Sequence, residues 1–137
     1  MAKKSWLEKF NVAREPVVEV SDKKFADIPE GSKMLIATPK VVDEYVRRIP
    51  KGTHATLQQM RKDLAAEYGA EYTCPITSGI FLRIASELAY GQYQNGTPLK
   101  EITPFWRMID KKAPLAKKLS FGYDFVAEQR KQEGLDV

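Results

Sequence analysis

Between residues 39 and 49, apolar residues recur every three to four positions and charged residues fill the positions between them. This spacing places the apolar side chains on one face of a helix and the charged side chains on the other. The apolar stripe consists of Val41, Val42, Tyr45, Val46 and Ile49. Pro50 and Gly52 follow the stripe, and because neither continues a helix well, we expect the helix to end there.

A second helix is predicted to begin after Thr56. Thr56 followed three residues later by Gln59 has the form of a capping box, which satisfies backbone donors at the start of a helix. Gly69 is a typical C-terminal stop. The buried side of this helix is predicted to be Leu57, Met60, Leu64 and Tyr68.

A third helix is predicted to start at Thr77 or Ser78, since either side chain can cap it, and to run to about Gly91. One face of this helix is apolar and is expected to pack inward. That face consists of Phe81, Leu82, Ala85, Leu88 and Ala89. The other face is polar and is expected to be exposed. It consists of Arg83, Ser86, Glu87 and Tyr90.

Residues 1–38 have a different pattern and are interpreted as an N-terminal extension that packs on the main domain. Ser5 followed by Trp6 indicates a short capped helix. Residues 16–20 and 33–37 are rich in residues that favour β-strands, and a turn sequence separates them.

The main domain is predicted to span residues 39–137. Residues 99–109 resemble a strand, and residues 121–133 predict a last helix that Gly134 closes. Two helices joined by a short connection, then a loop and a strand, is the order of a winged helix-turn-helix. The sequence therefore predicts a mostly helical α/β fold of the winged helix-turn-helix type.

The composition fits one compact domain, because 137 residues with 43% hydrophobic content suffice for a single core. The 22 Lys and Arg residues outnumber the 18 Asp and Glu residues, which gives a net charge of +4. This charge permits an anionic partner without requiring one. Four lysines gather in residues 111–120. A solvated loop is the simpler interpretation of that run, and phosphate contact is the alternative.

The sequence contains few of the residues that form metal or redox sites. Cys74 is the only cysteine and His54 the only histidine, so neither an internal disulfide nor an ordinary zinc site can form. We interpret the Cys74 thiol as inert and His54 as a surface or capping-region residue, and we expect no cofactor. No apolar run approaches the roughly 20 residues that cross a bilayer, and the start lacks the apolar stretch of a signal peptide. These features predict a cytoplasmic monomer without a membrane partner, associated with the nucleoid if bacterial.

Four segments match a known family in order. Residues 47–60, RRIPKGTHATLQQM, resemble the family stretch RRIPKGxVxTYxxIA, and residues 83–92, RIASELAYGQ, are similar to its recognition helix RAVGGAxRxN. Residues 102–109, ITPFWRMI, fall on IPCHRVV, and residues 120–134 fall on the closing SGG…HEG. Over about two thirds of its length, the chain thus resembles the C-terminal DNA-binding domain of methylated-DNA–protein-cysteine methyltransferases, and more closely the non-enzymatic alkyltransferase-like proteins.

In that family, DNA is bound through its minor groove and a cysteine thiolate removes an alkyl group from a flipped nucleotide. The resemblance places Phe105 at the cysteine position and Trp106 at the histidine position. Neither ring can form a thiolate or carry a proton, so we expect the protein not to be an enzyme of this kind.

The resemblance also implies a set of DNA-binding residues. Arg83 falls on the arginine that replaces the flipped nucleotide, and the helical pattern independently predicts that it is exposed. Ser86 and Tyr90 share that predicted face, whereas Glu87 would repel phosphate there. The residues expected to hold backbone phosphates are Arg47, Arg48, Lys51, Ser78 and Arg107. For Arg107, support of its own loop is an equally open interpretation.

Six residues fall on the family's nucleotide pocket. They are Leu57, Phe105, Trp106, Ser120, Phe121 and Glu133. Leu57 replaces a tyrosine that contacts phosphate, which weakens the case for nucleotide flipping. Phe105 and Phe121 are expected to fill the cavity together. For Phe105 and Trp106 we favour packing in the core over stacking on an extrahelical base, and for Glu133 we favour a structural ion pair.

These inferences lead to a non-catalytic protein that binds double-stranded DNA in the minor groove, with Arg83 filling the base stack. The resemblance implies alkylated or distorted DNA as ligand and repair proteins as partners. The changes at Leu57, Phe105 and Phe121 leave generic DNA binding open beside lesion recognition. The alternative is a degenerate scaffold that serves as a protein-interaction module without binding DNA.

Overall fold

A computed structural model describes residues 5–137 as a mixed α/β fold that is mostly helical, as predicted. Residues 1–4 of the expected extension lie outside the described part. The elements in chain order are α1 (Trp6–Phe10), β1 (Val17–Val20), β2 (Lys33–Ile36), α2 (Pro39–Arg47), α3 (Leu57–Glu67), β3 (Tyr72–Thr73), α4 (Pro75–Gln94), the 3₁₀ turns η1 (Leu99–Glu101), η2 (Phe105–Arg107) and η3 (Pro114–Lys117), and α5 (Asp124–Gln132).

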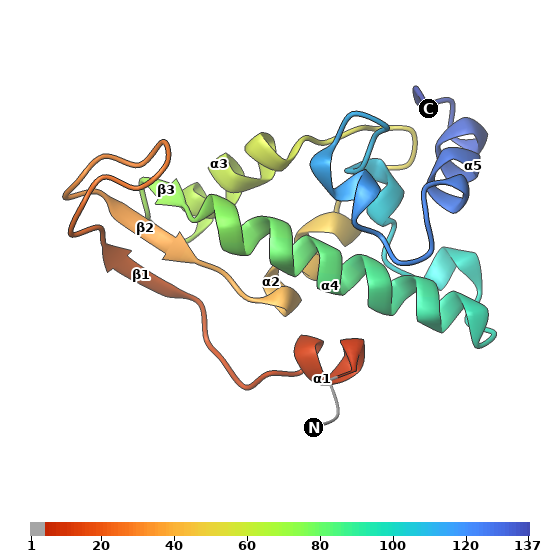
Figure 1. Cartoon of the computed structure of the whole chain (residues 1–137), viewed down its shortest axis with the longest axis horizontal. Coiled ribbons are helices and arrows are strands. Elements are labelled where there is room, and N and C mark those ends of the chain that lie inside the picture. The colour runs from red at the N-terminus through yellow and green to blue at the C-terminus, as the bar shows by residue number, and fades with distance from the viewer. Residues whose placement is uncertain (1–4) are drawn as a thin grey trace.

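The three strands form one small sheet in the order β1-β2-β3. β1 pairs with β2 in antiparallel fashion, and β3 pairs with β2 in parallel, with Leu35 opposite Thr73. Because β3 directly precedes α4, this pairing attaches the N-terminal segment to the main body. Figure 1 shows the sheet at one end of the molecule and α5 at the other, with α4 running along the length between them.

Helices α2 and α3 begin where the sequence predicts, because their caps are local. The Thr38 side chain accepts a hydrogen bond from the Val41 N–H at the start of α2, and the Thr56 side chain accepts one from the Gln59 N–H at the start of α3. The Gln59 side chain donates to Asp63 instead of returning to the cap, so only half of the predicted capping box forms.

Helix α4 is longer than predicted. It begins at Pro75, where the missing N–H of proline costs nothing, and Cys74 takes the capping position. The expected cap Ser78 lies inside the helix, where its hydroxyl donates to the Cys74 carbonyl. The helix then continues past Gly91 to Gln94.

The predicted strand over residues 99–109 is wrong. The segment forms the 3₁₀ turns η1 and η2, and Pro98 and Pro104 precede them. Phe105, Trp106, Met108 and Ile109 are all buried. Burial of nearly every side chain produces an apolar run that resembles a buried strand, and the residue pattern alone does not separate the two.

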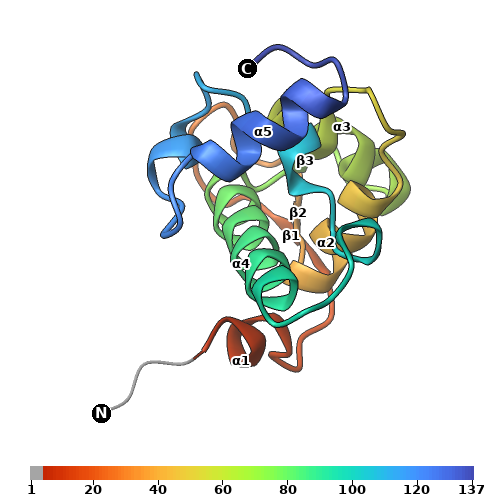
Figure 2. The same ribbon diagram turned by 90° about the vertical axis from the view of Figure 1, so that its right-hand side faces the viewer.

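The core lies between α2, α3, α4 and the buried residues of 102–109. Helix α1 packs beside α4 on the side away from α5, as the end view in Figure 2 shows. Trp6 and Phe10 of α1 contact the edge of this core, which agrees with the expected packing of the extension. None of the helices within residues 5–137 is long and apolar enough to span a membrane.

Candidate functional site: a groove beside helix α4

A groove of about 910 Å³ lies between α1, the start of α3, the N-terminal half of α4 and residues 108–118. We call it the α4 groove. Ile76 and Ile80 are one helical turn apart on α4 and remain 57% and 51% exposed. The other apolar residues that line the groove include Trp6, Leu57, Met108 and Leu115. Exposed isoleucines on a helix face mark a surface that a ligand or partner can cover.

The charges around the α4 groove are mainly positive. The basic residues that line it are Lys9, Arg83, Lys112 and Lys118. Asp110 is the acidic residue among the lining groups, and His54 stands next to it, with 3.9 Å between the His54 Nε2 and an Asp110 carboxylate oxygen. Burial lowers the pKa of His54 and the nearby Arg130 charge lowers it further, whereas the Asp110 charge raises it. The groove therefore combines apolar walls with an excess of positive charge.

Arg83 lies at the border of this groove, where it contacts Glu87 and Trp6. Its Nε is 3.6 Å from a carboxylate oxygen of Glu87, and its guanidinium carbon is 5.2 Å from the centre of the Trp6 ring. The Nε is buried and makes no hydrogen bond. The side chain as a whole remains 38% exposed, so the predicted exposure of Arg83 is confirmed in part.

The prediction that Ser86 and Glu87 are exposed on α4 is wrong. Ser86 is fully buried, and its hydroxyl donates to the Leu82 carbonyl one turn earlier. Glu87 is also buried, because both the N–H and the hydroxyl of Ser120 donate to its carboxylate. The segment after η3 thus covers this side of the helix. Ser78 is likewise fully buried. Neither serine can reach a phosphate on the surface.

Tyr90 belongs to an aromatic cluster and does not line the α4 groove. Its ring stacks on Phe121 with 3.9 Å between the ring centres, and Phe125 meets its edge. The Tyr90 hydroxyl accepts a hydrogen bond from Gln94. This side chain is therefore engaged in packing at the C-terminal half of α4, away from Ile76 and the groove.

The basic residues at the end of α2 also lie outside the α4 groove. Arg47 pairs with Asp43 at 2.9 Å, and Arg48 pairs with Glu67 at 2.7 Å. Lys51 is exposed in the turn that follows. These three residues remain on the surface, but the structure does not bring them together with Arg83 in one hollow.

The expected nucleotide pocket is filled by aromatic rings. Phe105 is fully buried, with its ring centre 5.4 Å from Trp106, 5.7 Å from Phe121 and 5.9 Å from Phe125. The interpretation of Phe105 and Trp106 as core residues is confirmed. Ser120 is exposed and bound to Glu87. Of the six residues assigned to that pocket, Leu57 alone lines the α4 groove.

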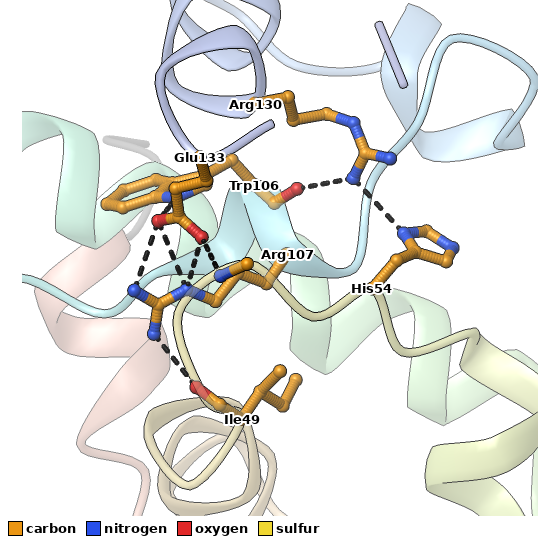
Figure 3. A network of polar contacts seen from close by, with 7 residues as sticks. Ile49, His54, Trp106, Arg107, Arg130 and Glu133 are labelled. Carbon is orange, nitrogen blue, oxygen red and sulfur yellow. Dashed lines mark hydrogen bonds and ion pairs between the residues drawn. The ribbon is translucent and has the colours of Figure 1, made fainter. Parts of the chain in front are cut away.

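Glu133 is the centre of a buried polar network, shown in Figure 3. Its carboxylate accepts hydrogen bonds from the Arg107 guanidinium, the Trp106 Nε1–H and the Gly52 N–H. Burial alone would raise the pKa of Glu133, but these hydrogen bonds outweigh burial and hold the pKa below its ordinary value. Arg107 also donates to the Ile49 carbonyl at 2.8 Å. The structure thus confirms an ion pair for Glu133, and Arg107 links its own segment to the segments that carry Ile49 and Glu133.

Arg130 of α5 extends the same network. Its Nη1 donates to the Trp106 carbonyl at 2.7 Å and lies 3.1 Å from His54 Nδ1, which faces it in Figure 3. Since Arg130 is buried and always charged, His54 is held with Nδ1 as an acceptor. His54 thereby joins the buried network to the α4 groove that it lines.

Several groove residues were not singled out by the sequence. A helix that starts at Thr77 or Ser78, as the sequence predicts, excludes Ile76 and so hides its pairing with Ile80. Their spacing of four residues was the signal that could have identified them. Lys112 and Lys118 belong to the lysine run for which a solvated loop is the simpler interpretation, and the sequence indicates for Trp6 only a place in a short helix.

Within residues 5–137, no cluster of three or more His, Cys, Asp and Glu side chains is arranged to hold a metal ion. The Cys74 thiol is buried at the start of α4 and lines neither the groove nor a charged cluster. Comparison of the chain with protein-family models, with curated proteins and with solved structures finds no match.

Proposed function

We propose that this protein is a non-catalytic DNA-binding protein and that DNA is held at the α4 groove. The observation that carries the proposal is the set of four basic side chains around apolar walls, with Arg83 among them. The phosphates of DNA require positive charge nearby. Its bases and sugars offer surfaces that can pack on apolar groups. A groove with both features fits such a ligand.

The resemblance to alkyltransferase-like proteins supports the finer part of this proposal. On that basis the main domain is a winged-helix-like DNA-binding domain that approaches the minor groove with α4. On the same basis, Phe105 and Trp106 stand at the positions of the reactive cysteine and histidine, and neither ring supplies a nucleophile for alkyl transfer. The rings of Phe105 and Phe121 pack against each other at positions that the resemblance assigns to the nucleotide pocket, so we propose that an extrahelical nucleotide enters the α4 groove instead.

Two neighbouring lysines provide a matched test. Lys118 lines the groove, whereas Lys117 is exposed and does not line it. The binding of a fluorescent DNA duplex is measured by anisotropy at several salt concentrations for wild type, Lys118→Ala and Lys117→Ala. Each phosphate contact contributes about 0.9 to the slope of log affinity against log salt. We expect Lys118→Ala to weaken binding and reduce this slope by about one contact, and Lys117→Ala to leave both unchanged.

The same titration tests whether the protein prefers alkylated DNA to unmodified DNA. A steep salt dependence with equal affinity for duplexes with and without an O6-alkylguanine supports DNA binding and excludes lesion recognition. A clear preference for the alkylated duplex supports both. If wild type does not bind either duplex at low salt, the DNA-binding proposal is wrong.

A protein-interaction module is the second candidate, and the exposure of Ile76 and Ile80 favours it. Protein interfaces have apolar centres, and these two side chains form an apolar strip on α4. Such a partner would bind with weak salt dependence, and the loss caused by Ile80→Ala would exceed the loss caused by Lys118→Ala. DNA binding through phosphates predicts the opposite order.

A further inference from the structure

Helix α1 places Trp6 in the α4 groove. Of the residues of this helix, Trp6 and Phe10 contact the edge of the core. Helix α1 has five residues and buries none of them fully. Its fold is fixed locally by a complete capping box, in which Ser5 and Glu8 exchange hydrogen bonds. The half-buried Trp6 ring lines the groove.

The chain contains a second tryptophan that shows the contrast. Trp106 is 4% exposed, and its Nε1–H donates to Glu133 at 2.7 Å. This is the usual arrangement of a structural tryptophan, with its apolar surface buried and its N–H paired. Trp6 instead keeps ring surface in contact with the groove.

The surroundings of Trp6 are cationic. The Lys9 Nζ lies 4.4 Å from the ring centre, and the Arg83 guanidinium carbon lies 5.2 Å from it. A cation over an aromatic ring is stabilised by about 0.5–1 kcal/mol at exposed sites, so a ligand can displace it at small cost. Lys9 and Arg83 thus place two positive charges beside an aromatic surface. A nucleotide offers the complementary groups, a flat base and a phosphate.

We propose that Trp6 stacks on an unpaired nucleobase that enters the α4 groove, while Lys9 and Arg83 neutralise the adjacent phosphates. This inference rests on the proposed function and assigns a ligand-binding role to the N-terminal segment. Stacking needs only the face of the base, so the site accepts different bases. The apolar strip of Ile76 and Ile80 contacts the rest of the nucleotide.

The test uses two substitutions that separate stacking from packing. Trp6→Phe keeps an aromatic face, whereas Trp6→Leu keeps an apolar side chain without one. Binding is measured to a fully paired duplex and to the same duplex with one extra unpaired adenine. Loss of a stacked base corresponds to about 5- to 150-fold in affinity. We expect Trp6→Leu to lose this much on the duplex with the unpaired base and less than about threefold on the paired duplex, and Trp6→Phe to remain within about threefold of wild type on both.

Tryptophan fluorescence gives an independent readout. A base stacked on Trp6 quenches its emission, so wild type is expected to lose fluorescence on binding the duplex with the unpaired adenine. Trp6→Phe retains only Trp106, which is buried outside the groove, and its emission is expected not to change. Thermal unfolding of each variant checks that the fold is retained.

The outcomes separate this inference from the proposed function. If wild type binds neither duplex, both are wrong. If wild type binds DNA but Trp6→Leu binds the duplex with the unpaired adenine as well as wild type does, only the stacking role is wrong. If Trp6→Leu binds that duplex more tightly, α1 covers the site instead of contributing to it, and the inference is again overturned.

Discussion

Arg107 and Glu133 form a bidentate ion pair between η2 and the end of α5. The Arg107 Nε donates to one carboxylate oxygen at 2.9 Å and the Nη2 donates to the other at 3.0 Å. The same arginine reaches the Ile49 carbonyl after α2. Three segments that are distant in the sequence therefore meet at one buried charge pair.

Removing one member of this pair is expected to be costly, because the other would be left buried and unpaired. Arg107→Ala is predicted to lower the free energy of unfolding by about 3–5 kcal/mol. Arg48→Ala breaks the exposed pair with Glu67 and is predicted to cost less than about 1 kcal/mol. Urea denaturation compares the two variants. Similar losses for both would show that burial of the Arg107–Glu133 pair does not determine its contribution.

The lowered pKa of Glu133 predicts a pH dependence of stability. Its folded-state pKa lies below the ordinary value of 4.5, so its contribution is fully present above about pH 4.5 and is lost as pH falls through the folded-state pKa. Glu133→Gln lacks this titration. The difference in unfolding free energy between wild type and Glu133→Gln is expected to be constant above about pH 5 and to shrink below about pH 4.5. A difference that does not change down to about pH 3 would contradict this assignment.

His54 gives a direct electrostatic test because it is the only histidine in the chain. Its pKa is expected below the ordinary 6.5, first from burial and then from the charge of Arg130. Arg130→Gln should raise the pKa, and Asp110→Asn should lower it further, since the Asp110 charge raises it. NMR titration of the imidazole protons measures all three proteins. Movement of the pKa in the opposite direction in either variant would disprove the proposed surroundings of His54.

Phe105 is predicted to stabilise the fold without taking part in binding. It is fully buried among aromatic rings, so Phe105→Ala should cost about 3–5 kcal/mol by leaving a cavity. Since Phe105 does not line the α4 groove, the folded fraction of the variant should bind duplex DNA as wild type does. Calorimetry and anisotropy at low temperature measure the two effects. A large loss of affinity in folded protein would place Phe105 at the ligand.

The sequence predicts well the features that depend on near neighbours. The caps at Ser5 and Thr56 lie within three residues of the groups they bind, and α1 and α3 form accordingly. Helix α5 ends before Gly134, which adopts the left-handed conformation that glycine favours. These signals do not require knowledge of the rest of the fold.

The predictions that are wrong concern residues whose contact partners are distant in the sequence. Glu87 is buried because Ser120, 33 positions later, supplies its hydrogen bonds, and helical periodicity carries no information about that contact. The α4 groove also depends on contacts between residues that are distant in the sequence. The sequence singles out Arg83 and Leu57, but Trp6 reaches the groove only because α1 packs beside α4. No local pattern indicates that association.

The most direct test of the account is to map where DNA contacts the protein. Backbone amide signals are followed by NMR while a short duplex is added to wild type and to Arg83→Ala. We predict that the signals of Ile76, Ile80, Arg83, residues 112–113 and residues 115–118 shift in wild type and that the shifts largely disappear in Arg83→Ala. Shifts confined to another surface, such as β1 and β2, or equal shifts in both proteins, would contradict the claim that the α4 groove binds DNA.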